Sequence, residues 1–126
     1  MRVAVVGGTG PFGRALATRL KEAGDEVVIG SRDAARAAAT AAALGVEGAT
    51  NAEAVRGVDL VVLATQADAA LETARDLREA IGATPVLSVA SDLRVTADGA
   101  RPSSEPTSIA ERIQAELQGP VVAGLH

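Results

Sequence analysis

The segment that decides the fold is Gly7–Asp33, GGTGPFGRALATRLKEAGDEVVIGSRD. It follows a short β-branched run, Arg2–Val6, and its glycines give way to apolar residues at helical spacing between Pro11 and Gly24. A second β-branched run, Glu26–Gly30, follows at once. This order predicts a strand, a glycine-rich turn, a helix that opens at the proline, and a second strand parallel to the first.

Beyond this segment, short β-branched runs continue to alternate with helical patterns, which predicts a doubly wound α/β fold in one domain, residues 1–126. We expect about six parallel strands in the order 3-2-1-4-5-6. The further strands are expected at 46–49, 58–65, 85–89 and 121–125, and the further helices at 33–44, 50–56, 68–82 and 108–118. Gly45 is expected to end the second helix and Thr50 to cap the third, while Leu77 belongs to the apolar stripe of the fourth. Residues 90–106, rich in Pro, Ser, Asp and Arg, are predicted to form a long loop.

The composition excludes several classes of function. Phe12 is the only aromatic residue and the net charge is −4, which argues against binding of single-stranded or double-stranded nucleic acid. Cysteine is absent and His126 is the only histidine, so thiol chemistry and thiolate or histidine metal sites are not expected. The apolar N-terminal run is too short for a signal peptide or a membrane span, so we expect a cytoplasmic protein without a membrane partner.

The glycine-rich turn fits the pattern G-x-G-x-x-G, which is formed by Gly8, Thr9, Gly10, Pro11, Phe12 and Gly13. Between a strand and a helix this pattern predicts a dinucleotide site, although a glycine turn without a ligand has the same appearance. The first glycine allows the tight turn, the second allows a pyrophosphate to approach the backbone, and the third allows close helix packing. The start of the helix then offers free N–H groups to the anion.

The second strand ends in Gly30, Ser31 and Arg32, where an NAD site usually has an acid that accepts hydrogen bonds from the ribose 2′-OH. A hydroxyl and a guanidinium suit a 2′-phosphate instead, and Arg36 lies one helical turn further on. We therefore predict a preference for NADP over NAD. Asp33, the nearby acid, is interpreted as a helix cap. The alternative for Arg32 is a solvated surface residue.

The stretches MRVAVVGGTGPFGRALATRL, GDEVVIGSRD and ARPSSEPTSIAERIQAEL followed by VVAGLH resemble the NADPH-dependent deazaflavin reductases. The resemblance implies NADP(H) as cofactor and hydride transfer to or from the deazaflavin coenzyme F420, with no catalytic acid or nucleophile from the protein. By position, it implies contacts to the pyrophosphate from Thr9, Gly10, Pro11 and Phe12, to the 2′-phosphate from Ser31, Arg32 and Arg36, to the nicotinamide from Thr65 and Gln66, and to the deazaflavin from Ser88, Val89, Ala90 and His126.

The resemblance is weaker where the second substrate would bind. Family members tend to have proline-bearing segments after the fourth and fifth strands, where this chain has Gln66-Ala67-Asp68 and SVASDL. They also continue into a C-terminal helical domain that completes the deazaflavin pocket and helps to form a dimer, which is not expected within these 126 residues. Activity would then need a second domain or a partner, and a homodimer is one possibility.

Three functions therefore stay open: the NADP-binding domain of a deazaflavin reductase, a non-catalytic NADP-binding or interaction module, and an NADP-linked reductase of another substrate such as an imine or a metal chelate. Two residue roles also stay open. Phe12 would either shield the nicotinamide or have a structural role, packing under the first helix or covering the loop. His126 would either contact the deazaflavin or belong to a frayed chain end.

Overall fold

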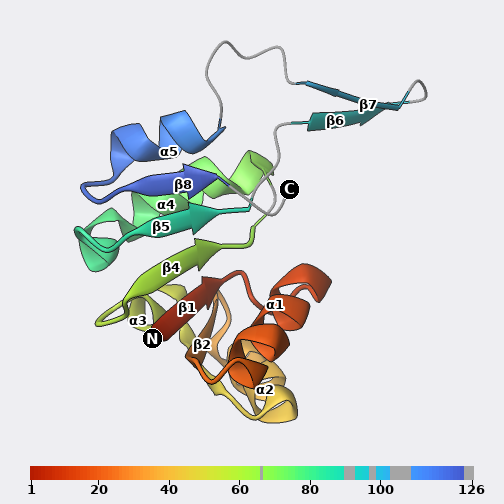
Figure 1. Cartoon of the computed structure of the whole chain (residues 1–126), viewed down its shortest axis with the longest axis vertical. Helices are drawn as coiled ribbons and strands as arrows, with labels where there is room; N and C mark the ends of the chain where they lie inside the picture. The colour runs from red at the N-terminus through yellow and green to blue at the C-terminus, as the bar shows by residue number, and fades with distance from the viewer. Residues whose placement is uncertain (66, 90–92, 97–98, 103–108, 124–126) are drawn as a thin grey trace.

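The computed structural model of the chain describes residues 1–65, 67–89, 93–96, 99–102 and 109–123. Its main feature is a six-stranded sheet in the order β3-β2-β1-β4-β5-β8, in which every pairing is parallel (Figure 1). The predicted doubly wound fold and the predicted strand order are confirmed. The strands are β1 (Arg2–Val6), β2 (Glu26–Ser31), β3 (Glu47–Thr50), β4 (Leu60–Leu63), β5 (Val86–Ser88) and β8 (Val121–Ala123).

Helices cover both faces of the sheet, and two apolar clusters form the core. The helices are α1 (Pro11–Glu22), α2 (Ala34–Leu44), α3 (Asn51–Ala54), α4 (Ala67–Ile81) and α5 (Ile109–Glu116). α1 and α2 lie on one face, over β1 to β3, while α3, α4 and α5 lie on the other (Figure 1). Side chains of β1 enter both clusters in alternation, which is why this strand is apolar at nearly every position.

Local signals set the ends of the helices as the sequence predicts. The N–H groups of Ala35 and Arg36 donate to Asp33 Oδ1 at 2.9 and 3.2 Å, so Asp33 caps α2. Gly45 then ends α2 with a left-handed φ of 71°, a conformation that costs glycine little. Thr50 caps α3 by accepting a hydrogen bond from the N–H of Glu53 at 3.4 Å. These caps place the residues that follow β2 and β3 at the carboxyl edge of the sheet.

The prediction of a single long loop at 90–106 is wrong in part, because two short strands form within it. β6 (Leu93–Thr96) and β7 (Gly99–Pro102) pair antiparallel in a separate two-stranded sheet, from Leu93 opposite Pro102 to Thr96 opposite Gly99. The signal was an Asp-Gly dipeptide, 98–99, beside a β-favouring run, which is typical of hairpins. The surrounding prolines and serines hid it. The predicted helix start at 108 and the end of the last strand at 124–125 lie outside the described residues.

Two features are absent from the described residues. None of the helices there is both long and apolar enough to cross a membrane. Within the same part of the chain, no group of three or more His, Cys, Asp and Glu side chains is placed to hold a metal ion.

Candidate functional site

The glycine-rich loop between β1 and α1 is fixed to the end of β2. The N–H groups of Gly7 and Gly8 both donate to the carbonyl oxygen of Gly30, at 3.1 and 3.2 Å. Gly7 has a φ of 75°, the left-handed region that favours glycine. The first two residues of the loop are therefore anchored at the carboxyl edge of the sheet by the protein's own hydrogen bonds.

The three motif glycines are required for different reasons, which can be judged from where a Cβ atom would lie. At Gly8 the atom would lie 2.9 Å from the oxygen of Val5, and at Gly13 it would lie 2.5 Å from Cα of Gly8. At Gly10 the nearest atom is 4.0 Å away, the oxygen of Gly7. Packing alone therefore explains the first and third glycines. The fold leaves open space beside Gly10, as expected if a ligand approaches the backbone there.

The start of α1 presents the remaining loop residues. Gly10 is the N-cap of α1 and makes no side-chain capping hydrogen bond, and Pro11 opens the helix as predicted. Phe12 is 46% exposed, so it does not pack beneath α1. Thr9 is half-buried in the loop. This edge combines uncapped helix N–H groups with an exposed aromatic ring.

At the end of β2, the residues that follow the strand have separate roles. Ser31 is buried, and its Oγ accepts a hydrogen bond from the N–H of Asp33 at 3.2 Å. The Asp33 carboxylate caps α2, as predicted. Arg32 and Arg36 are exposed, and neither forms an ion pair within the described part of the chain.

Packing also explains why position 30 is a glycine and not the acid of an NAD site. A Cβ at this position would lie 2.7 Å from Oδ1 of Asn51 and 3.2 Å from Cβ of Ala54. Helix α3 therefore closes the space in which a side chain at position 30 would extend. An acid at this position would displace the Asn51 side chain and would crowd Ala54 and the backbone of α3.

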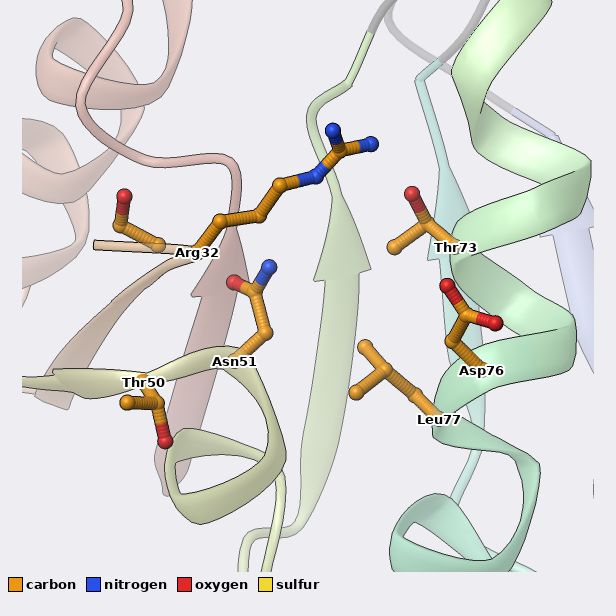
Figure 2. A pocket seen from close by; sticks show the side chains of 7 residues that line it. Arg32, Thr50, Asn51, Thr73, Asp76 and Leu77 are labelled. Carbon is orange, nitrogen blue, oxygen red and sulfur yellow. The ribbon is translucent and has the colours of Figure 1, made fainter. Parts of the chain in front are cut away.

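Next to Arg32 lies a pocket of about 250 Å³ between the end of β2, α3 and α4 (Figure 2). It is lined by Ser31, Arg32, Thr50, Asn51, Thr73, Asp76 and Leu77. Arg32 extends across the pocket toward α4, which contributes the last three of these residues (Figure 2). Ser31, which lines the pocket, directly follows Gly30, whose carbonyl oxygen holds the glycine loop.

Several polar groups around the pocket have no partner of their own. Oδ1 of Asn51 is buried without a hydrogen bond. Thr73 is only 6% exposed, and its hydroxyl makes no hydrogen bond within the described residues. Asp76 is exposed and forms no ion pair there. A wall of unpaired donors and acceptors is typical of a site that completes its hydrogen bonds with a ligand.

The carboxyl ends of β4 and β5 carry two further buried hydroxyls. The methyl group of Thr65 would lie 2.9 Å from a Cβ at Gly7, so Thr65 lies against the glycine loop. Ser88, at the end of β5, is 1% exposed. The hydroxyl oxygens of both residues are buried without a hydrogen-bond partner. The other three predicted site residues, Gln66, Ala90 and His126, lie outside the described residues.

Sequence reasoning missed most of the pocket. Thr50 was interpreted only as a cap and Leu77 only as part of an apolar helix stripe, and Asn51, Thr73 and Asp76 were not singled out. A usable signal existed for Asn51, because residues that follow parallel strands gather at one edge of the sheet. The α4 residues gave none, because the packing of α4 beside α3 depends on contacts distant in sequence.

Comparison with known proteins agrees with this geometry. Residues 2–92 match the family described as "NADP oxidoreductase coenzyme F420-dependent". The chain belongs to this family. Over 90 residues it is 41% identical to the F420-dependent NADP reductase of Methanothermobacter thermautotrophicus, covering 64% of this chain and 39% of that protein. The chain thus spans about two fifths of the length of this curated relative.

Solved structures extend the similarity over nearly the whole chain. One is an Arthrobacter sp. FB24 protein described as an F420-dependent NADP-reductase, with a TM-score of 0.79 and 26% identity over 96% of this chain and 60% of that one. Another is the Streptomyces aurantiacus imine reductase, with a TM-score of 0.70 and 28% identity over 98% of this chain and 40% of that one.

Proposed function

We propose that this chain is the NADP(H)-binding domain of an oxidoreductase that transfers hydride between NADPH and coenzyme F420. The observation that carries the proposal is the match of residues 2–92 to a family of that description. The cofactors supply the chemistry, a hydride that moves between C4 of the nicotinamide and C5 of the deazaflavin. The chain's own residues bind and orient the two rings.

The pyrophosphate is held at the glycine loop by Thr9, Gly10, Pro11 and Phe12. The open space beside Gly10 supports this assignment, because no packing requirement explains a glycine there. The uncapped start of α1 adds free N–H groups and the positive end of the helix dipole. The loop is already fixed to β2, so little ordering is needed when the anion binds.

The 2′-phosphate is held by Ser31, Arg32 and Arg36, which gives a preference for NADP. Both guanidinium groups lack ion-pair partners among the described residues, and the nearby Asp33 carboxylate is occupied by the α2 cap. A hydrogen bond to a charged group contributes about 1.5–3 kcal/mol. Since both arginines are exposed, we take the lower value, about tenfold for each contact. Two contacts then give a preference for NADPH over NADH on the order of a hundredfold.

The nicotinamide would lie near Thr65 and Gln66, with the deazaflavin toward Ser88–Ala90 and His126. Thr65 supports this placement because it lies against the glycine loop and its hydroxyl has no partner. We further propose that residues 1–126 are one NADP-binding domain. The deazaflavin pocket would be completed by a helical domain like that of other family members, or by a second copy of the chain.

A second candidate is an NADP-linked reductase of another small substrate, such as an imine. It is favoured by the similarity of nearly the whole chain to the S. aurantiacus imine reductase. A third, a non-catalytic NADP-binding module, shares the same cofactor site. All three candidates require NADPH binding, so only the compound that accepts the hydride, if there is one, distinguishes them.

The test is to incubate the purified chain with NADPH and oxidised F420 and follow the absorbance of the deazaflavin, with a cyclic imine in a parallel reaction. Reduction of F420 alone supports the main proposal. Reduction of the imine alone supports the second candidate. NADPH binding without turnover of either is expected of the third candidate, and equally of a domain whose deazaflavin pocket is completed by another domain. A chain that does not bind NADPH contradicts all of them.

A further inference from the structure

Asp76 is a charged residue that the fold does not use. Its neighbours Arg75 and Arg78 both form ion pairs with Glu116 of α5, at 3.0 and 3.8 Å. Asp76 forms no ion pair in the described part of the chain and lines the pocket instead. A carboxylate turned toward a pocket and away from its available partners is a candidate for ligand recognition.

Asp76 belongs to a compact set on one face of α4. Thr73, Asp76 and Leu77 are spaced three and four residues apart, so they lie side by side on the helix. Together they present a hydroxyl, a carboxylate and an apolar group to the same space (Figure 2). The Thr73 hydroxyl has no partner although the residue is only 6% exposed. In the same pocket lining, Oδ1 of Asn51 is buried without a partner, which is costly and is a second sign that a ligand completes the pocket.

The opposite wall suits a flat aromatic group. Arg32 extends over the pocket from the end of β2, and a guanidinium plane stacks well on an aromatic face (Figure 2). Leu77 supplies apolar contact from α4. The volume, about 250 Å³, is below the usual range for a whole drug-sized ligand, so only part of a dinucleotide fits. The pocket is lined by Ser31 and Arg32 of the proposed 2′-phosphate site, and the aromatic group of the dinucleotide nearest to that phosphate is the purine base.

We propose that Asp76, with Thr73, selects the purine of the cofactor by reading its 6-amino edge. This inference rests on the proposed function. Asp76 would accept a hydrogen bond from the exocyclic amino group, and the Thr73 hydroxyl would donate to the adjacent ring nitrogen. An ionised carboxylate can only accept, whereas a hydroxyl can donate or accept. The carboxylate therefore rejects a purine that carries an oxygen at this position.

The test compares NADP⁺ with its deamino analogue, nicotinamide hypoxanthine dinucleotide phosphate, each competing with NADPH for the chain. The two ligands carry identical phosphates, so effects of charge on the phosphates cancel in their ratio. We expect NADP⁺ to bind about tenfold more tightly, the lower end for one discriminating base contact, because Asp76 is exposed. In Asp76→Asn the side-chain amide can donate as well as accept, so the ratio should fall to about twofold or less.

Glu79→Gln is the matched control, because Glu79 is an exposed acid on the same helix that does not line this pocket. It should keep the tenfold ratio. Equal binding of NADP⁺ and its deamino analogue by the wild type would overturn the proposal, and so would a ratio that survives Asp76→Asn. These results differ from a failure of the proposed function, in which NADPH itself would not bind. If Asp76 only positioned Arg32, the substitution would change both affinities and leave their ratio unchanged.

Discussion

A pair of glycine substitutions separates folding from cofactor binding at the loop. In Gly13→Ala the new Cβ would lie 2.5 Å from Cα of Gly8, and backbone atoms cannot move aside as a flexible side chain can. We expect the upper end of the range for overpacking, a loss of about 3 kcal/mol in the free energy of unfolding. At about 4 °C per kcal/mol for a chain of this size, Tm falls by about 12 °C.

Gly10→Ala should have the opposite profile. The nearest atom to the new Cβ is 4.0 Å away, and a φ of −78° is open to any residue. Stability should stay within about 1 kcal/mol of the wild type, since the lower entropy of the unfolded chain offsets a poorer N-cap. The methyl group occupies the approach of the pyrophosphate, so the Kd for NADPH should rise by about tenfold or more, which corresponds to about 1.4 kcal/mol.

Thermal unfolding followed by circular dichroism and NADPH titration followed by nicotinamide fluorescence measure the two effects separately. A Gly13→Ala variant as stable as the wild type would show that packing does not require a glycine at position 13. A Gly10→Ala variant that binds NADPH with unchanged affinity would show that the pyrophosphate does not approach the backbone at position 10.

Three further substitutions test single features. Gly30→Asp introduces the acid of an NAD site and should lower the free energy of unfolding by about 2 kcal/mol through its clash with Asn51. It should not improve NADH binding, and a gain of NADH affinity would contradict the steric role of Gly30. Ser88→Ala removes a buried hydroxyl without a partner, so urea unfolding should show a stability gain of about 1 kcal/mol, and a loss would show that the hydroxyl has a partner. Hydrogen bonding to Glu47 raises the pKa of Arg2 above its ordinary value, so the contribution of this ion pair to stability is lost only in strongly alkaline solution. Arg2→Gln should lower the free energy of unfolding by less than about 1 kcal/mol, equally at about pH 6 and about pH 9. A loss that differs between the two pH values would contradict this.

The sheet could be predicted from the sequence because local signals specify it. β-branched runs alternate with helical patterns, and right-handed crossovers then leave few arrangements of the strands. The caps at Asp33 and Thr50 and the stop at Gly45 are also local, and each is found where predicted. The hairpin of β6 and β7 was missed because its only strong signal, one Asp-Gly dipeptide, lies within a segment rich in turn-forming residues.

The pocket beside Arg32 could not be predicted, because its walls come from four separate elements, β2, β3, α3 and α4. The glycine motif reports only the β1–α1 turn and the end of β2. Asp76 and Thr73 reach the pocket because α4 packs on the same face of the sheet as α3. The steric role of Gly30 could not be predicted either, because the atom that a Cβ at position 30 would meet belongs to Asn51 of α3, a separate element.

We expect the end of β2 to select NADP over NAD, and a titration of the purified chain with NADPH and then NADH measures this selection. Nicotinamide fluorescence can be read without protein emission, because the chain has no Trp and no Tyr. We predict that NADPH binds on the order of a hundredfold more tightly than NADH, and that Arg32→Ala reduces this preference about tenfold, because only NADPH carries the 2′-phosphate. Equal affinity of the wild type for NADPH and NADH would show that the end of β2 does not select NADP.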